Sequence, residues 1–449
     1  MTNDGMNSFL FSTPEMTHVF SPAERLRAMT RFEWALSCAL ESNGLAEPGS
    51  SQALKPLLMA DFVDADALAR EAREAGNVAI PFVRQLTAAV KVRSETAARS
   101  VHLGATSQDV LDTALVLQMK EALKLLEAAW ARLEAALLGQ VKRHRDRVMQ
   151  GRTWLQPGPP TTLGLKLAGT LAALRRGWER IQAEGGRALM LQFGGAVGTL
   201  ASLGTDGSAV SADLARRLDL PEPLLPWHTH RDNLVAMVQS LAILTGTLAK
   251  LGRDVALLMQ AEVGEVAEGG GGRGGSSTMP HKHNPVASAA LIAIHARMPG
   301  LAATMLLAMP QEHERGLGLW QAEWDTVPEA FRLASASVAY ATELTEGLTV
   351  DGERMLANLA ASRGLPLAEA VSAALAPRIG RSAAHDLLGG AADRAIAENR
   401  HLSSVLKQMP DVTAHLSATE IDELLDVRNY LGSAQRLIAR VVGDDDARH

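Results

Sequence analysis

The sequence contains a single cysteine, Cys38, among its 449 residues. One thiol excludes a disulfide within the chain and a metal site built from cysteines, and it fits a protein of the reducing cytoplasm. Aromatic residues are also scarce, at 4%, whereas hydrophobic residues reach 47% and are mainly alanine and leucine. This balance favours helices that pack on helices, so we expect an all-α protein.

The sequence has no excess of basic residues, since its formal net charge is −6 and both signs are interspersed. We therefore expect no nucleic-acid partner. The N-terminal residues lack the pattern of a signal peptide, and no uncharged apolar run reaches the roughly 18 residues that cross a membrane. We expect a soluble cytoplasmic protein with no membrane partner.

Helical periodicity dominates the middle of the chain. From residue 109 to 149 apolar side chains recur every three, four or seven positions, as one face of a helix requires. At about 1.5 Å per residue this helix is a rod of about 60 Å, longer than one small domain can cover. Four more such segments follow, at 162–192, 232–268, 286–308 and 322–345, and no strand pattern is visible among them.

Shorter helices are expected on both sides of these rods. Ser21 and Glu24 can form a capping box before one of them, and Ser417 and Glu420 can form another near the C-terminus. A central bundle of five long helices with a smaller helical domain on each side explains this arrangement. The predicted domains are residues 1–108, 109–350 and 351–449.

A glycine-rich segment, residues 269–275, follows the third long helix. Six of its seven residues are glycine, so neither a helix nor a strand is expected there. The next residues, SSTMPHKHNP at 276–285, are a dense set of acids, bases and hydrogen-bond donors. A loop that closes over a substrate explains this combination, and a solvated linker is the simpler alternative. A phosphate-binding Walker loop is not supported, because its Gly-Lys-Ser/Thr ending is missing.

Three other polar clusters stand at the ends of the long helices: HLGATSQD at 102–109, GRTWLQPGPPTT at 151–162 and PWHTHRD at 226–232. Thr106 and Ser107 could simply cap the helix that follows, although such a helix end can also bind an anion. The other clusters have structural interpretations too: Trp154 as a core residue, His228 and His230 as a packed loop, and Arg231 with Asp232 as an ion pair.

The segment GSSTMPHKHNP at 275–285 resembles the signature of the fumarase/aspartase superfamily, which includes adenylosuccinate and argininosuccinate lyases. HLGATSQD and the Thr-x-x-Gln-Pro stretch at 153–157 resemble the other two signature segments. The matches occur in the expected order, and the resemblance covers residues 20–435. It implies an all-α subunit of three domains, a homotetramer, and active sites that several chains share.

The resemblance also implies a chemistry. Members of the superfamily remove a proton from a carbon next to a carboxylate, which gives an aci-carboxylate dianion, and they expel a group from the neighbouring carbon. Carried over by position, Ser276 transfers the proton with Ser277 as the alternative, Lys282 promotes the ionisation of the serine, and Asn284 holds a carboxylate. Lys282 and backbone amides would supply the positive potential that the dianion needs. No cofactor is implied.

One departure separates branches of the superfamily. Many lyases have Thr-His in the second segment and use the histidine to protonate the leaving group, whereas this sequence has Thr153-Trp154. A leaving amine or hydroxide needs such an acid, but a carboxylate, with a pKa of about 4, does not. Because the reverse of expelling a carboxylate is lactone formation, the sequence resembles the lactonising cycloisomerase branch. That branch acts on a muconate with three carboxylates during protocatechuate breakdown.

We expect the substrate to be held by residues from all four clusters. His281 and His283 flank Lys282 as metal ligands can, but no carboxylate or cysteine lies close in the sequence, so no metal is expected. Ser276 and Lys282 are the catalytic candidates. The substrate-binding candidates are His102, Thr106, Ser107, Trp154, Gln156, His228, Ser277, Met279, Asn284 and Arg315.

Two other functions remain open. A superfamily lyase that releases fumarate, for example from adenylosuccinate, would need a histidine acid, and Trp154 argues against it. A non-catalytic structural protein, like the crystallins of some animals that use this scaffold, would not need Ser276, Lys282 and Asn284, all of which are present.

Overall fold

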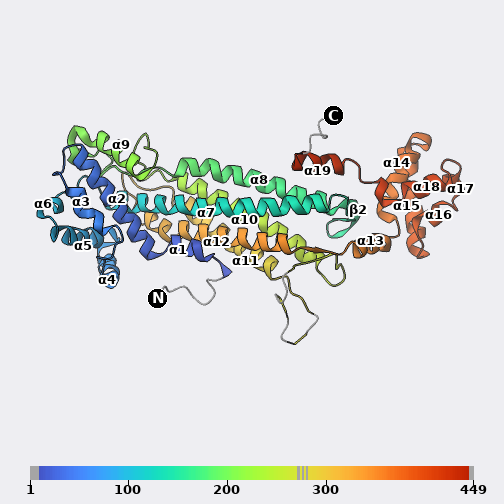
Figure 1. The fold of residues 1–449 in the computed structure, drawn as a ribbon. Coiled ribbons are helices and arrows are strands. Elements are labelled where there is room, and N and C mark those ends of the chain that lie inside the picture. Colours follow the sequence, from blue (N-terminus) through green and yellow to red (C-terminus); the bar gives the residue numbers. More distant parts are fainter. Residues whose placement is uncertain (1–9, 270–273, 276–277, 280–281, 444–449) are drawn as a thin grey trace. The chain divides into compact units, whose positions relative to one another are not determined.

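The computed structural model describes residues 10–269, 274–275, 278–279 and 282–443. Helices make up most of these residues (Figure 1), so the all-α prediction is confirmed. The five predicted rods are all present. They are α7 (Ser107–Arg143), α8 (Leu163–Ala188), α10 (Asp232–Leu258), α11 (Val286–Leu307) and α12 (Leu319–Gly347).

The chain forms two compact units, and the long helices contribute residues to both. The first unit contains residues 1–130, 176–246 and 293–339, and the second contains 131–175, 247–292 and 340–449. This division falls within helices. It does not test the predicted domain boundaries near residues 108 and 350, which stay a prediction.

The first unit has a core of apolar side chains that includes Phe32, Phe82 and Trp320. Its first long helix, α2, begins where predicted, because the Ser21 hydroxyl accepts a hydrogen bond from the amide of Glu24. The Glu24 carboxylate instead pairs with Arg27, so only half of the predicted capping box forms. The shorter elements are α1 (Pro14–Val19), α2 (Pro22–Ser42), α3 (Ser50–Leu54), η2 (Lys55–Leu57), α4 (Ala65–Ala75), α5 (Ala79–Lys91), α6 (Glu95–Ala98), η3 (Ala201–Asp206) and α9 (Gly207–Leu218).

The second unit contains the C-terminal helices, which surround a core of their own that includes Val371, Leu388 and Leu406. Both bonds of the predicted capping box at Ser417 and Glu420 are present. The elements are α13 (Gly352–Ala361), η4 (Leu365–Leu367), α14 (Ala368–Ile379), α15 (Arg381–Ala397), α16 (Leu402–Leu406), α17 (Pro410–Thr413), α18 (Ala418–Leu424), η5 (Val427–Asn429) and α19 (Ala434–Val442).

Two short antiparallel sheets also lie in the second unit, so the prediction of no strands was wrong. The longer sheet is a hairpin whose turn consists of Trp154 and Leu155, with φ angles of 51° and 63°. Such left-handed turns usually contain glycine or asparagine, and the strand after this turn contains prolines, so residue preferences gave no sign of a hairpin. The strands are β1 (Val148–Thr153) with β2 (Gln156–Thr162), and β3 (Val266–Ala267) with β4 (Thr349–Val350).

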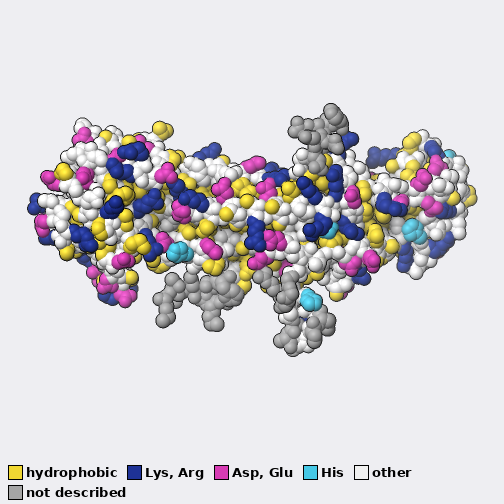
Figure 2. Space-filling model, viewed as in Figure 1, with side chains coloured by type: hydrophobic (Ala, Val, Ile, Leu, Met, Phe, Trp, Pro, Cys, Tyr) yellow, Lys and Arg dark blue, Asp and Glu magenta, His cyan; other side chains and the backbone are white. Residues whose placement is uncertain are grey.

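Two helices, α10 and α11, are long and apolar enough to cross a membrane by length and composition alone. In the most apolar window of α10, 61% of the residues are buried inside the protein, as in a core helix, but the figure for α11 is 33%. The described part of one chain therefore leaves apolar surface on α11 uncovered, including Leu306 and Leu307. On the face drawn in Figure 2, acidic and basic side chains are interspersed among hydrophobic ones.

Candidate active site

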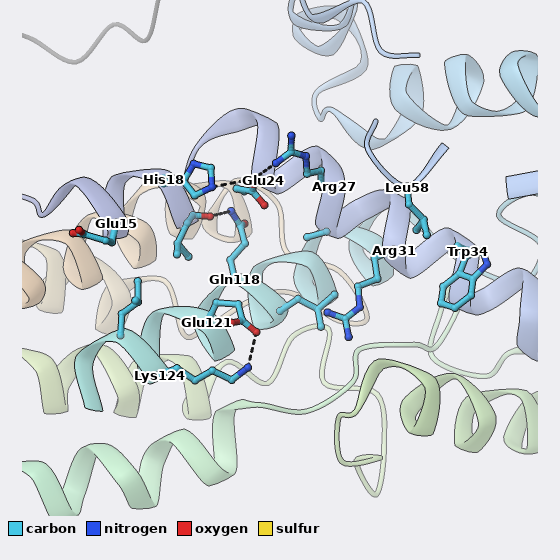
Figure 3. A pocket seen from close by; sticks show the side chains of 14 residues that line it. Glu15, His18, Glu24, Arg27, Arg31, Trp34, Leu58, Gln118, Glu121 and Lys124 are labelled. Carbon is cyan, nitrogen blue, oxygen red and sulfur yellow. Dashed lines mark hydrogen bonds and ion pairs between the residues drawn. The ribbon is translucent and has the colours of Figure 1, made fainter. Parts of the chain in front are cut away.

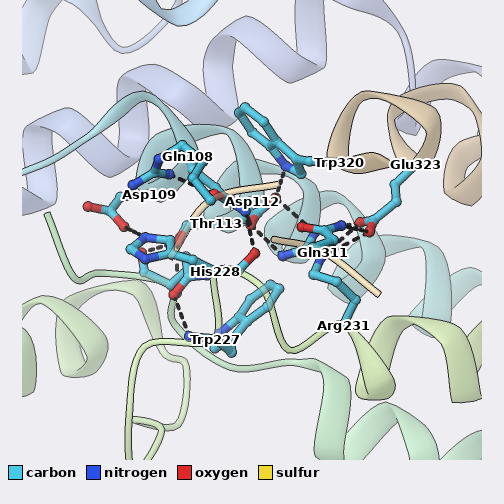
Figure 4. A network of polar contacts seen from close by, with 12 residues as sticks. Gln108, Asp109, Asp112, Thr113, Trp227, His228, Arg231, Gln311, Trp320 and Glu323 are labelled. Carbon is cyan, nitrogen blue, oxygen red and sulfur yellow. Dashed lines mark hydrogen bonds and ion pairs between the residues drawn. The ribbon is translucent and has the colours of Figure 1, made fainter. Parts of the chain in front are cut away.

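Three segments meet in the first unit around the start of α7 (Figure 4). They are the cluster at 102–109, the cluster at 226–232 before α10, and the stretch 311–323 that leads into α12. Their side chains form a connected network of hydrogen bonds and ion pairs.

Asp109 connects the first two of these segments with each other and with the connection after α8. Its buried carboxylate accepts hydrogen bonds from Nε2 of His228 at 2.7 Å and from the amides of Gly194 and Gly195 at 3.1 and 2.9 Å. It also accepts a bond from the amide of Thr106 at 3.0 Å. One carboxylate thus fixes the first turn of α7, the ring of His228 and the glycine-containing connection after α8.

Thr106 and Ser107 lie at the beginning of α7 and are half-buried. The carboxylate that caps this helix end belongs to Asp109, and neither hydroxyl has a hydrogen-bond partner among the described residues. The interpretation of these hydroxyls as simple helix caps is therefore not supported. The N-terminus of a helix carries partial positive charge, so this end of α7 can receive a carboxylate.

His102 lies just before this helix end and bonds to a buried carboxylate. Its Nδ1 is 2.6 Å from Oε1 of Glu33, and its amide donates to Oε2 of the same residue at 3.1 Å. Burial alone lowers the pKa of His102, but the Glu33 carboxylate outweighs this effect and raises the pKa above its ordinary value. A raised pKa favours the protonated ring, so His102 is a candidate cation close to the start of α7.

Arg315 is held by neutral groups rather than by acids. Its Nη1 donates to Oε1 of Gln108 at 2.6 Å, and its Nη2 donates to the carbonyl of Ala196 at 2.8 Å. Gln108 is fixed in turn by a 2.7 Å bond from its Nε2 to the carbonyl of His228. Arg315 forms no ion pair with the described residues, so its charge is available to a substrate carboxylate.

Arg231 forms the buried ionic centre of the network. Its Nη1 lies 2.7 Å from Asp112, its Nη2 lies 2.6 Å from Glu323, and its guanidinium is 4.8 Å from the ring centre of Trp227. The expected structural ion pair therefore exists, but with these acids rather than with Asp232. Burial raises the pKa of Glu323; Arg231 opposes this shift and the charge of Asp112 adds to it.

Trp154 and Gln156 lie in the second unit, on the hairpin. Both side chains are exposed, and 98% of Trp154 is accessible, so it is not a core residue of its own chain. Close to the turn, both terminal nitrogens of Arg152 donate to Glu265, at 2.9 and 2.6 Å, and this ion pair anchors the hairpin. Asn358 also donates to this carboxylate, at 2.7 Å.

The signature loop is described in part. Met279 and Lys282 are exposed, and the Lys282 amide donates to the Met279 carbonyl at 3.0 Å. Asn284 donates to the carbonyl of Gly274 from its amide at 2.8 Å and from Nδ2 at 2.9 Å, so here its side chain fixes the loop. Three residues named in the sequence interpretation, Ser276, Ser277 and His281, lie outside the described residues.

The first unit thus brings together part of the predicted site, and the rest belongs to the second unit. Sequence reasoning missed Glu33, Gln108, Asp109, Asp112 and Glu323. Asp109 and Asp112 were detectable in principle, because two acids three positions apart interrupt an otherwise apolar stretch of helix. No three His, Cys, Asp or Glu side chains among the described residues are grouped as metal ligands. The first unit gathers His102, Thr106, Ser107, His228 and Arg315, and the second carries Trp154, Gln156, Met279, Lys282 and Asn284.

Comparison with known proteins finds relatives along almost the whole chain. Residues 70–300 match the family model described as lyase, and residues 364–441 match the model for the adenylosuccinate lyase C-terminus. A 3-carboxy-cis,cis-muconate cycloisomerase of Pseudomonas aeruginosa is 49% identical over 99% of this chain and 97% of the relative. A nitrosuccinate lyase of Streptomyces davaonensis is 40% identical over 95% of this chain and 92% of the relative.

A solved structure is similar over the same length. The crystal structure of 3-carboxy-cis,cis-muconate lactonizing enzyme from Pseudomonas putida superimposes with a TM-score of 0.92 at 47% sequence identity and covers 98% of both chains. The fold, the signature segments and these relatives together show that the chain belongs to the lyase family of the fumarase/aspartase superfamily.

Proposed function

We propose that this protein is a cycloisomerase that converts 3-carboxy-cis,cis-muconate into a carboxymuconolactone, a step of protocatechuate breakdown. The observation that carries the proposal is the indole of Trp154, which stands where many lyases of the superfamily carry a histidine acid. A reaction whose leaving group, in the reverse direction, is a carboxylate does not need that acid. The similarity to cycloisomerases along the whole chain supports the same activity.

In the proposed mechanism a carboxylate oxygen of the substrate attacks a carbon of the distant double bond, and a C–O bond forms. The electron pair of that double bond moves onto the adjoining carboxylate as an enediolate. Ser276 then gives its proton to the carbon next to this carboxylate, which completes the lactone. Lys282 would stabilise both the enediolate and the ionised serine.

The substrate carries three carboxylates, and the proposed site supplies cationic and dipolar groups for them. In the first unit these are the His102 imidazolium, the start of α7 at Thr106 and Ser107, and the Arg315 guanidinium. His228 would orient the substrate from beside Asp109. The groups proposed from the second unit are Gln156, Ser277, Met279, Lys282 and Asn284, with Trp154 as a wall.

We further propose a cytoplasmic homotetramer whose active sites combine segments of several chains. The support is α11, whose apolar surface remains largely uncovered in one chain: Leu307 is 73% exposed and Leu306 is 52% exposed. Obligate interfaces between helical subunits are large and apolar. Light scattering of the purified protein should give four chains, and Leu307→Glu should reduce that number, whereas Val92→Glu, at an exposed position on the end of α5, should not.

The activity is tested by ultraviolet absorbance of 3-carboxy-cis,cis-muconate, because ring closure interrupts the conjugated diene. We expect rapid decay with the wild-type protein and loss of that decay in Ser276→Ala, with the oligomer unchanged. If the absorbance still decays with Ser276→Ala, we would assign the proton transfer to Ser277 instead. Absence of decay, with fumarate released from adenylosuccinate or nitrosuccinate, would identify a lyase, and inactivity on all of these would favour a structural protein.

A further inference from the structure

A cavity of about 470 Å³ lies in the first unit between the starts of α2 and α12, helix α4, and one side of α7. This volume is within the range of small-molecule sites in proteins. Most of its wall is apolar and includes Leu26, Met29, Leu68, Leu111 and Trp324.

One side chain in this wall, Arg25, carries a charge that has no direct partner. Its guanidinium lies 5.9 Å from the ring centre of Trp324, and it makes no hydrogen bond or ion pair with any described residue. Burial lowers the pKa of Arg25, and Asp325 and Asp112 oppose this shift only through space. A half-buried guanidinium against apolar walls loses hydration, so an anion bound beside it would be stabilised.

Two of the other charged groups in the wall have bonded partners, and a third, the exposed carboxylate of Asp325, acts on Arg25 only through space. Asp112 accepts bonds from Arg231 and from Nε1 of Trp320. Arg332 donates to the carbonyl of Phe20 at 3.0 Å. Among the described residues, the guanidinium of Arg25 therefore lies without a direct partner beside a large apolar surface.

A second hollow, of about 650 Å³, lies nearby in the same unit and provides a comparison (Figure 3). There the Glu24 carboxylate pairs with both Arg27 and His18, and Lys124 pairs with Glu121. Most charged side chains of this hollow thus form ion pairs with each other, whereas Arg25 forms none with a described residue.

We propose that the cavity at Arg25 binds a small carboxylic acid with an apolar body. The carboxylate would form a bidentate pair with Arg25, the geometry that guanidinium favours. The apolar body would pack against the half-buried side chains of Leu26, Leu115 and Trp324 and displace water from them. An inorganic anion could pair with Arg25 but has no apolar body to bury. A neutral amide has the apolar body but cannot form the ion pair.

Calorimetric titration of the full-length protein with benzoate tests this site without any measurement of activity. We expect saturable binding of benzoate that benzamide and inorganic phosphate do not reproduce. Arg25→Gln should weaken benzoate binding by at least about tenfold, and Arg25→Lys, which keeps the charge but not the fork, should weaken it less. Arg27→Gln, on the same helix but in the second hollow, should leave it unchanged.

The proposed active site also contains an unpaired arginine, so Arg315→Gln is the necessary control. Benzoate affinity that falls in Arg315→Gln and survives in Arg25→Gln would overturn the proposal, because the ligand would then bind elsewhere. Equal binding of benzamide, or no binding of benzoate to the wild-type protein, would overturn it as well. Thermal unfolding of each variant establishes that it is folded before the titration is interpreted.

Discussion

The carboxylate of Asp109 lies 2.7 Å from Nε2 of His228, although 119 positions separate the two residues. The same carboxylate receives the amides of Gly194 and Gly195, which belong to a third segment. The start of α7, where Thr106 and Ser107 would meet the substrate, is thereby fixed to two distant parts of the chain. The arrangement of the proposed site depends on this one side chain.

We expect Asp109→Asn to disrupt the site, because an amide has one acceptor oxygen where the carboxylate has two, and its NH₂ group would face other donors. Loss of these charge-assisted bonds should lower the free energy of unfolding by about 2–4 kcal/mol. Displacement of Thr106 and Ser107 should lower kcat/KM by at least about tenfold. Urea denaturation and the absorbance assay measure these effects.

The matched control is Asp411→Asn, a change of the same chemistry at an exposed position in α17. It should alter stability by less than about 0.5 kcal/mol and leave activity intact. If Asp109→Asn behaves like this control, Asp109 does not organise the site.

Arg231 and its two acids make a second prediction, which concerns stability. Arg231 is 1% exposed, and Arg231→Met would leave Asp112 and Glu323 buried without their cation. Breaking a buried ion pair in this way costs roughly 3–5 kcal/mol. Chemical denaturation should show this loss, with the oligomer examined in parallel.

Glu323→Gln is the informative comparison, because it removes one of the two acids and keeps Arg231 paired with Asp112. Burial already raises the pKa of Glu323, so we expect this variant to lose less stability than Arg231→Met. A raised carboxyl pKa contributes stability at pH values below the unfolded value of 4.5, and this is lost as pH rises through the folded pKa. Equal losses in both variants at neutral pH would contradict this account.

The long helices and the signature segments could be predicted from the sequence because their information is local. A helix such as α7 repeats its apolar positions at fixed spacing, and HLGATSQD and SSTMPHKHNP are contiguous. The hairpin could not be predicted, because Trp154 and Leu155 adopt left-handed backbone angles that their side chains disfavour. Contacts elsewhere, such as the pair of Arg152 with Glu265, hold the strands in place.

The partners of the predicted residues were also beyond sequence reasoning. Glu33 lies 69 positions before His102, within a helix whose pattern gives no reason to single it out. Arg231 was read with its neighbour Asp232, but its actual partners are Asp112 and Glu323. Residue type alone can identify a reactive side chain. The side chain that orients it can be distant in the sequence, so it becomes known only from the fold.

His102 should make stability depend on pH. Its folded pKa is raised above the ordinary value of 6.5 by Glu33, so the pair contributes stability that is fully present below 6.5 and is lost as pH rises through the folded pKa. We expect the difference in unfolding free energy between wild type and His102→Asn to be largest in mildly acidic solution. Asparagine suits the left-handed backbone of this position, where φ is 59°. A difference that stays constant across this range would show that Glu33 does not raise the pKa of His102 in the folded protein.

Substitutions of Trp154 can distinguish a role in stability from a role at a shared active site. Its side chain is 98% exposed in one chain, so removing the indole should change the stability of the subunit by less than about 0.5 kcal/mol. Trp154→Asn preserves the turn, because asparagine tolerates a φ of 51°. If the hairpin tip forms a wall of the substrate site in another chain, KM should rise by about tenfold or more while the variant stays folded.

Leu224→Asn provides the control for this experiment, since Leu224 is also fully exposed but lies in a loop of the first unit. It should leave both KM and stability unchanged.

Trp154→His is the more demanding variant, because it places the histidine of many lyases at the position where this chain has tryptophan. A gain of fumarate release from a succinyl substrate by Trp154→His would show that this one side chain decides between the two reactions. If lactonisation is lost and no fumarate release is gained, Trp154 shapes the site but does not decide which reaction occurs.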